Sequence, residues 1–519
     1  MKVEKIELGN TNAFSSFFLD YISSKESLSL FYGRKAQIES FEGQIAEKNF
    51  EQQKREVLHK VLSEQYDDLD TSAPVQTNTD ALLDENTFTV TTGHQLNIFT
   101  GPLYFIYKIV TVINACKALK AKYPEKNFVP VYWMASEDHD FEEINHFSLF
   151  GKKYAWNCDQ KGAVGRFSTD SIQDLLSELP EKVELFERAY TSHKQLVDAV
   201  RCYINDLFGD YGVIAMDADD RRLKAQFSEV VEDDILNHHA NDLVEETSSK
   251  LSSLDYHAQV FPRAINFFYM DGDIRERIVK GDAQWKVLNT DLTFSEEQIK
   301  QLIRDEPEKF SPNVVMRPLY QEMILPNLAY CGGPAEVVYW MQLKRVFEYY
   351  QTPFPILMPR NFALIVNKAV GKKMQKFEFS NEDIFLKEEV LKEIHLRSLG
   401  DGEIDLSEER RVLQTVFEGL TDKANSVDGS LKGFIGAENS KALRCISAIE
   451  KRLKKANEQK NESALNQISA LKSKLFPNGS LQERHDNFLN FYINNPEFIS
   501  ELVNLFDPFD YSFNMLKDE

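Results

Sequence analysis

Short apolar runs and one helical stretch give the first third of the chain a recognisable order. Residues 88–92 and 128–135 predict buried strands, because they are apolar or β-branched throughout rather than alternating with polar residues. Pro102 stands where a helix would start, and residues 103–123 continue a helical pattern that ends in lysines. Pro74 and the polar residues after it predict a loop ahead of the first strand. The order strand, helix, strand predicts a βαβ unit of a parallel sheet.

A dense polar cluster follows each of these two strands. The first cluster covers residues 91–95 and runs into 99–102, and the second covers 136–140 and runs into 142–146. Open parallel sheets bind ligands outside the carboxyl ends of their strands. The sequence therefore predicts a small-molecule site built from both clusters.

The same arrangement returns later in the chain. A Gly-Gly-Pro motif at 332–334 follows an apolar run and precedes a helical pattern, and residues 355–358 predict another buried strand. Between these core-like regions, residues 148–310 contain shorter β runs, including a hairpin over 264–279, and helical stretches. We therefore expect an α/β core that is interrupted by inserted material.

The region after residue 380 has a different pattern. Residues 406–434 carry apolar side chains seven positions apart, Gly436 ends this pattern, and residues 465–475 continue a helical stripe. The pattern predicts an antiparallel helical hairpin with coiled-coil character. Such a hairpin either packs on its own body or pairs with another subunit, and we favour self-association.

These patterns divide the chain into five segments. They are the first part of the core (1–147), the connecting insertions (148–310), the second part of the core (311–379), the helical coiled coil (380–476), and a C-terminal tail that docks on the core (477–519).

Composition narrows the class of protein. The 519 residues include 60 Lys and Arg against 82 Asp and Glu, a net charge of −22, which disfavours nucleic acid as a partner. No stretch approaches the ~20 apolar residues of a membrane span, and the charged N-terminus lacks the apolar core of a signal peptide. The five cysteines contain no Cys-x-x-Cys pair, which is typical of a reduced cytoplasmic protein without structural zinc.

The first polar cluster suits an anion. Gly93 lets a phosphate or carboxylate approach the backbone, and the N-terminus of the following helix adds unpaired N–H groups. His94 can donate to that anion or act as a general acid or base. The alternative is a tight strand-to-helix turn with His94 on the surface.

The second cluster holds three carboxylates and one imidazole within residues 136–140. This density suits a substrate ammonium group, the Mg²⁺ of a nucleotide, or a general base. His139 and His146 lie seven positions apart, on one helical face, with Asn145 beside them. The alternative is a helix start rich in capping residues, which explains the two histidines less well.

Two further groups of residues extend the candidate site. Gly332 and Gly333 permit close approach of a ligand, and Glu336 can accept from a ribose or an amine, although the loop also serves as a chain reversal. Arg317 and Arg360 suit bidentate recognition of a carboxylate or phosphate, and a structural ion pair is an equal alternative for both.

A catalytic zinc site is a weaker alternative. It would join His139 and His94 with Asp138 or Asp140. No spacing such as His-Glu-x-x-His supports it, so we rank it below a metal-free or magnesium-assisted site.

Taken together, these motifs resemble the bacillithiol biosynthesis cysteine-adding enzymes, a cysteine ligase family. The matching segments are 92–95 with 99–104, 133–146, 311–314 with 317–318, 330–336 with 339–340, and 481–484. The resemblance implies a Rossmann-like parallel-sheet core related to nucleotidyltransferases and class I synthetases, α+β connecting insertions, and a C-terminal coiled coil that forms a homodimer. His94 departs from the family pattern, because many members have glutamine at this position.

The implied reaction joins cysteine to the amine of glucosaminyl malate and yields the low-molecular-weight thiol bacillithiol. An amide does not form from a free carboxylate without activation. We therefore expect a nucleotide (ATP or ADP) to serve the reaction and the cysteine carboxylate to be activated as an adenylate, with Mg²⁺ accompanying the nucleotide and no zinc. In this interpretation Gly93 faces phosphate or carboxylate, Glu137 and Asp138 hold an amine, and His139 is the base.

The complete set of candidates follows from the motifs and the resemblance. The catalytic candidates are His94, Asp138 and His139, and the binding candidates are Gly93, Gln95, Thr100, Gly101, Ser136, Glu137, Asp140, Asn145, His146, Arg317, Gly332, Gly333, Glu336, Tyr339 and Arg360. Two other classes of function stay open: a metal-dependent amidohydrolase or deacetylase acting on a sugar conjugate, and a nucleotide-binding assembly module whose coiled coil is the working part.

Overall fold

The chain divides into two compact units in the computed structural model, which describes residues 1–399 and 405–518. Unit 1 contains residues 1–365 and 480–516, and unit 2 contains residues 366–479 and the C-terminal end from 517. Unit 2 thus begins before the predicted coiled coil and includes residues 366–379, which the sequence pattern placed with the core.

A five-stranded parallel sheet forms the centre of unit 1, which confirms the predicted α/β core. Its strand order is β13-β12-β2-β3-β6, and every neighbouring pair is parallel. The strands are β2 (Thr87–His94), β3 (Asn127–Met134), β6 (Ile214–Asp217), β12 (Asn327–Gly332) and β13 (Ile356–Pro359). The register places His94 opposite Met134, and Gly332 opposite Pro359, so the carboxyl ends of the strands meet along one edge.

Helices cover the sheet, and its strands are buried on both faces. Helix α5 (Tyr104–Lys122) packs on β2 and β3, as the predicted βαβ unit requires, and α9 (Leu196–Phe208) packs on β6. Helix α15 (Pro334–Met341) packs on β12 and β13 and is followed by α16 (Lys344–Tyr349). Helix α15 begins at Pro334, two residues after β12 ends at Gly332.

The predicted loop around Pro74 is a helix instead. Helix α4 (Ala73–Ala81) carries Pro74 in its first turn. A proline is tolerated there, because the first N–H groups of a helix have no partner within it. Ahead of it lie the helices α2 (Ser40–Glu47) and α3 (Gln52–Tyr66).

The inserted region contributes an antiparallel sheet of order β10-β9-β8-β7-β11. Strands β7 (Phe267–Asp271) and β8 (Ile274–Lys280) form the predicted hairpin, and β11 (Phe310–Pro312) pairs with β7 before the chain returns to the core. The remaining strands of this sheet are β9 (Trp285–Val287) and β10 (Thr293–Phe294). The region also contains β5 (Lys152–Ala155), which pairs with β4 (His146–Leu149), and the helices α8 (Glu184–Ser192), α11 (Ser228–Asn237), α12 (His239–Ser252) and α13 (Glu296–Asp305).

A third sheet joins segments from distant parts of the sequence. Strand β15 (Phe513–Lys517) lies between β1 (Lys2–Ile6) and β14 (Phe362–Val366). Gln482 and Glu483 accept hydrogen bonds from the backbone of β14, at Ile365 N (2.9 Å) and Ala363 N (3.2 Å). The segment after residue 480 is therefore an integral part of unit 1.

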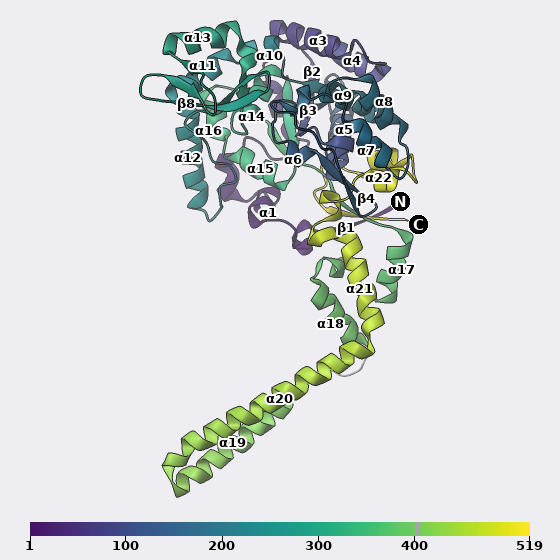
Figure 1. Cartoon of the computed structure of the whole chain (residues 1–519), viewed down its shortest axis with the longest axis vertical. Helices are drawn as coiled ribbons and strands as arrows, with labels where there is room; N and C mark the ends of the chain where they lie inside the picture. The colour runs from purple at the N-terminus through teal and green to yellow at the C-terminus, as the bar shows by residue number, and fades with distance from the viewer. Residues whose placement is uncertain (400–404, 519) are drawn as a thin grey trace. The chain divides into compact units, whose positions relative to one another are not determined.

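Unit 2 is helical, with a long antiparallel hairpin. Its helices are α17 (Lys368–Lys376), α18 (Glu388–Ser398), α19 (Ser407–Val427), α20 (Lys432–Lys460) and α21 (Glu462–Leu475). Helices α19 and α20 run side by side (Figure 1). Within the described residues, no helix combines the length and apolar character that a membrane crossing requires.

The turn of this hairpin comes earlier than the seven-residue pattern predicted. Asp428 ends α19 and accepts a hydrogen bond from Ser430 N (2.9 Å), whereas Gly436 lies inside α20. The start of α19 meets the later part of α20, because Arg410 Nη2 lies 2.6 Å from Glu450 Oε2. This pairing confirms the antiparallel arrangement.

Candidate functional site

A pocket of about 610 Å³ opens at the carboxyl ends of β2, β3 and β12 in unit 1. The chain runs from β2 to β3 on one side of the sheet and later adds β12 on the other side of β2. Such a reversal of strand order leaves a crevice in which open α/β sheets bind ligands. The predicted candidates that line the pocket are Gly93, His94, Gln95, Ser136, Glu137, Asp138, His139, Arg317, Gly333, Glu336, Tyr339 and Arg360.

Six predicted candidates lie outside the pocket lining: Thr100, Gly101, Asp140, Asn145, His146 and Gly332. Thr100 and Gly101 form a turn with positive φ angles of 69° and 62°. Asn487 Nδ2 fixes this turn by donating to Gly101 O at 2.6 Å. Asn145 Oδ1 pairs with His146 Nδ1 at 2.9 Å. Asn487 therefore holds the turn in place, and a role of these six residues in ligand binding stays a prediction.

Glu336 and Lys108 form an ion pair in the wall of the pocket, where the side chains are 26% and 3% exposed. Lys108 Nζ lies 2.6 Å from Glu336 Oε2 and donates to Gly93 O at 2.8 Å. Glu336 also accepts from Tyr330 Oη (2.7 Å) and Gly333 N (2.8 Å). Burial opposes its charge, but Lys108 and these hydrogen bonds hold the pKa of Glu336 down to about 2. The carboxylate is therefore charged and committed to internal partners.

His94 is a neutral imidazole among aromatic rings. Its ring lies 5.2 Å from Phe105 and 5.3 Å from Tyr104, measured between centroids. Burial, together with nearby Lys108, lowers the pKa of His94 to about 3. Nε2 is buried and has no hydrogen-bond partner among the described residues. At neutral pH, His94 can therefore offer a hydrogen bond to a ligand but no charge.

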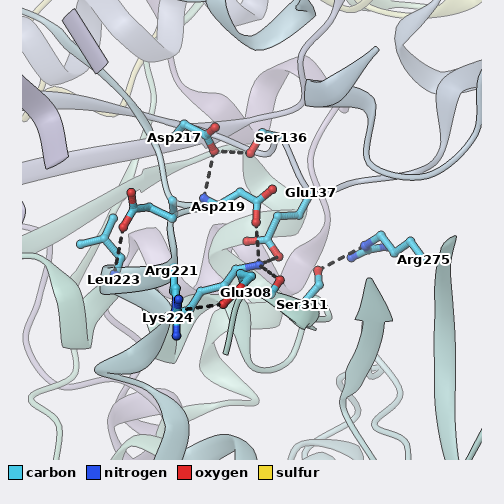
Figure 2. Close-up of polar contacts among 12 residues, drawn as sticks. Ser136, Glu137, Asp217, Asp219, Arg221, Leu223, Lys224, Arg275, Glu308 and Ser311 are labelled. Carbon is cyan, nitrogen blue, oxygen red and sulfur yellow. Dashed lines mark hydrogen bonds and ion pairs between the residues drawn. The ribbon is translucent and has the colours of Figure 1, made fainter. Parts of the chain in front are cut away.

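Two side chains of the second polar cluster, Ser136 and Glu137, have partners on the segment 217–224. Ser136 donates to the Asp217 carboxylate, and Glu137 Oε2 lies 3.0 Å from Lys224 Nζ (Figure 2). Lys224 also contacts Asp219 Oδ1 at 2.8 Å, and its side chain is buried. Glu137 already has a buried cation as its partner, so in this arrangement it stabilises the strand-end loops.

Asp138 and His139 remain at the pocket surface. Asp138 accepts from Gln95 Nε2 (3.0 Å) and from His139 N (2.7 Å). Burial opposes its charge, but Gln95 and nearby Arg275 keep the pKa of Asp138 below its usual value. Arg275 Nη1 contacts His139 Nδ1 at 2.5 Å, so the Nδ1 lone pair accepts that hydrogen bond and Nε2 carries the ring proton. Asp138 is thus the carboxylate best placed to receive an amine.

Arg317 lies in an aromatic cage. Its guanidinium carbon is 5.8 Å from the ring centroid of Trp133, 5.6 Å from that of Tyr330 and 5.8 Å from that of Trp340. Nη1 donates to Gln321 Oε1 at 3.1 Å. No carboxylate forms an ion pair with Arg317 within residues 1–399 and 405–518. Its charge is available to an anionic ligand.

Arg360 holds the C-terminal segment to the pocket wall. Nη2 lies 2.6 Å from Glu483 Oε1, and both side chains are almost fully buried. The structural ion pair, which the sequence left as an equal alternative, is therefore present. Arg484, the residue after Glu483, is exposed and lines the pocket.

Polar pocket residues that the candidate set did not include are Tyr104, Lys108, Arg275 and Arg484. Lys108 had a local signal, because it is a single charge in the otherwise apolar first turns of α5. Arg484 belongs to a segment that carried the family resemblance. Arg275 had no signal, because the hairpin that carries it reaches His139 across 136 positions of sequence.

The residues of the weaker zinc alternative do not assemble. The described parts of the chain contain no group of three or more His, Cys, Asp and Glu side chains arranged to hold a metal ion. His94 instead lies among aromatic rings, whereas Asp138 and His139 contact each other at the pocket surface.

Comparison with known proteins confirms the resemblance. The model for the N-terminal Rossmann-like domain of bacillithiol biosynthesis BshC matches residues 1–361, and that for its C-terminal coiled-coil domain matches 363–517. Proteins named "Putative cysteine ligase BshC" are similar over nearly their whole length. The chain is 43% identical to that of Flavobacterium psychrophilum (100% of both chains), 43% to that of Christiangramia forsetii (99% of both), and 40% to that of Cytophaga hutchinsonii (99% of this chain, 98% of the relative). The chain belongs to the bacillithiol biosynthesis BshC family.

Proposed function

We propose that this protein is a cytoplasmic cysteine ligase that joins cysteine to the amine of glucosaminyl malate in bacillithiol biosynthesis. The name of its relatives supports the cysteine ligase activity. The observation that carries the substrate assignment is the charge balance of the pocket. Glu336 and Glu137 are paired with Lys108 and Lys224, and Arg360 with Glu483.

The remaining pocket charges fit an amine that carries carboxylates. Arg275, Arg317 and Arg484 have no ion pair with a carboxylate in the described parts of the chain, whereas Asp138 is left as an acceptor. Two or more cations suit the two carboxylates of the malate group, and guanidinium groups bind carboxylates in a bidentate manner. Asp138 suits the amine. The chain has a net charge of −22, so this basic pocket is a local feature.

Asp138 and His139 have different roles toward the amine in this proposal: Asp138 orients it, and His139 is the base. Asp138 accepts an N–H of the amine and so directs its lone pair toward the cysteine carboxyl carbon. His139 donates from Nε2 while Arg275 occupies Nδ1, and it becomes a base only when Arg275 turns to a substrate carboxylate. This order would couple base function to substrate binding.

Activation of the cysteine carboxylate requires a nucleotide in this proposal. ATP supplies the leaving group when it is bound, and Mg²⁺ accompanies its phosphates. The first turn of α15, from Pro334 to Glu336, lines the pocket. Its N–H groups at Ala335 and Glu336 are the candidates for phosphate, because Pro334 has no N–H and Gly333 N donates to Glu336 Oε2. The first turn of α5 fits less well, because Leu103 N donates to Asp486 O at 2.7 Å.

The test is a mass-spectrometric assay of purified protein with cysteine and glucosaminyl malate, with and without ATP. We expect bacillithiol only with ATP, and we expect Asp138→Asn to lose most of this activity while Asp170→Asn, an exposed carboxylate outside the pocket, retains it. A folded Asp138→Asn protein with full activity would overturn the role of Asp138. Absence of product from every mixture would overturn the ligase assignment.

We also propose that the α19–α20 hairpin forms a homodimer contact. Neither helix contains a buried residue, and apolar side chains are exposed along both: Val412, Val416, Leu420, Phe434, Ile449 and Leu453. Exposed apolar rows of this kind are covered by a partner in stable coiled coils. Light scattering should show a dimer for the wild type and for Gln414→Glu, and a monomer for Leu420→Glu. A dimeric Leu420→Glu protein would contradict the proposal.

A further inference from the structure

The cage around Arg317 places a neutral amide where a counter-ion would normally stand. Gln321 follows Arg317 by one turn of α14 (Arg317–Ile324), is fully buried, and accepts from Arg317 Nη1 at 3.1 Å. The aromatic faces of the cage attract the cation without cancelling its charge. A buried guanidinium more often has a carboxylate partner, because an uncompensated charge is costly to bury.

The carboxylates of the surrounding network are each paired with another cation. Glu322, next to Gln321, lies 3.7 Å from Lys48 Nζ, and the two side chains are 0% and 2% exposed. Glu336 is paired with Lys108 at 2.6 Å. Because each of these two acids has its own lysine, no carboxylate among the described residues forms an ion pair with Arg317.

Hydrogen bonds fix which end of the Gln321 amide faces Arg317. Gln321 Nε2 donates to Glu322 Oε1 at 2.9 Å, and Asn327 Nδ2 donates to the same oxygen at 2.6 Å. Asn327 Oδ1 in turn accepts from Thr89 (3.0 Å) and Thr91 (2.8 Å) on the central strand β2. Since a guanidinium only donates, Gln321 must present its oxygen to Arg317 and turn Nε2 to Glu322. The network anchors the guanidinium to the middle of the sheet.

We propose that Gln321 is a positioning and specificity residue, which orients Arg317 and keeps its charge available for one carboxylate of the anionic substrate. The inference rests on the proposed function, because glucosaminyl malate supplies that carboxylate. Gln321 itself contacts no substrate. A glutamate in its place would act as the missing counter-ion, and the substrate carboxylate would then compete with it for Arg317.

Calorimetric titration of the full-length protein with glucosaminyl malate tests this role. Gln321→Glu adds a carboxylate at nearly constant shape, and we expect binding weaker by a factor on the order of 100, which corresponds to about 2.7 kcal/mol. Gln321→Met removes the hydrogen bond but adds no charge, and we expect a loss of about tenfold. Gln53→Glu, an exposed residue of α3, is the charge-matched control and should bind as the wild type does.

The outcomes separate the effect of a charge at position 321 from the effect of losing the hydrogen bond that orients Arg317. Equal weakening by Gln321→Glu and Gln321→Met would overturn the charge argument, and wild-type binding by both would overturn the whole inference. If Gln321→Glu does not fold, Gln321→Met decides: we expect a higher KM for glucosaminyl malate with an unchanged KM for cysteine, and unchanged values for both would overturn the proposal. A wild type that binds no glucosaminyl malate would overturn the proposed substrate instead, which distinguishes the two failures.

Discussion

The buried imidazole of His94 makes the stability of unit 1 depend on pH. Burial and Lys108 lower the pKa of His94 to about 3, against about 6.5 in an unfolded chain. Between these two values the unfolded state binds a proton that the folded state does not. The free energy of unfolding therefore falls as the pH is lowered through this window. His94→Gln has no proton to bind and should lack this contribution.

The two pKa values set the size of the effect. Linkage gives a loss of about 2 kcal/mol from His94 between pH 7 and pH 5. Two buried acids act in the opposite direction, because burial raises the pKa of Asp217 to about 6 and that of Asp234 to about 7. Their contribution is common to both proteins and cancels in the comparison. His94→Gln should therefore lose about 2 kcal/mol less than the wild type over this interval.

Urea unfolding at pH 7 and pH 5, followed by tryptophan fluorescence, measures this difference. All four tryptophans, at positions 133, 156, 285 and 340, belong to unit 1, so the signal reports the unit that contains His94. A difference in the free energy of unfolding between the two proteins that is the same at pH 7 and pH 5 reflects packing alone. Parallel loss of stability by wild type and His94→Gln between pH 7 and pH 5 would refute the reasoning.

Two further substitutions test the packing of the site. Lys108→Met leaves Glu336, whose side chain is 26% exposed, as a partly buried charge without its cation. The free energy of unfolding at pH 7 should therefore fall by about 1–3 kcal/mol, and adding Glu336→Gln should restore part of it; a loss below about 0.5 kcal/mol in urea unfolding would contradict this. Gly165→Ala would place its Cβ 2.6 Å from Ser136 Cβ and 3.0 Å from Ser136 O, so we expect about 1–3 kcal/mol of destabilisation, checked by the same unfolding measurement. Wild-type stability of Gly165→Ala would show that the loop carrying Ser136 can move freely.

The parallel core was predictable because its signals are local. Apolar runs mark β2 and β3, a proline marks the start of α5, and glycines mark the end of β12. Each signal depends on a few neighbouring residues, so the order of strands and helices follows from the sequence. The early turn of the α19–α20 hairpin was missed because the seven-residue spacing continues through Asp428, where the backbone reverses.

The direction of each site side chain was not predictable. Glu137 and Asp138 are neighbours in a loop, yet Glu137 meets Lys224 and Asp138 meets Gln95. Which carboxylate is left for a ligand depends on long-range partners, and these are set by tertiary packing. The sequence could therefore identify the cluster but could not assign roles within it.

The position of Arg484 in the chain has a consequence for synthesis on the ribosome. The pocket uses residues from Gly93 onward, but Glu483 and Arg484 follow the whole of the unit 2 segment 366–479. A nascent chain that has formed the parallel sheet still has Arg360 without Glu483, because that partner has not yet been translated. A truncated product could thus contain the sheet and lack a finished pocket, so incomplete chains would not compete for the substrates of the complete enzyme.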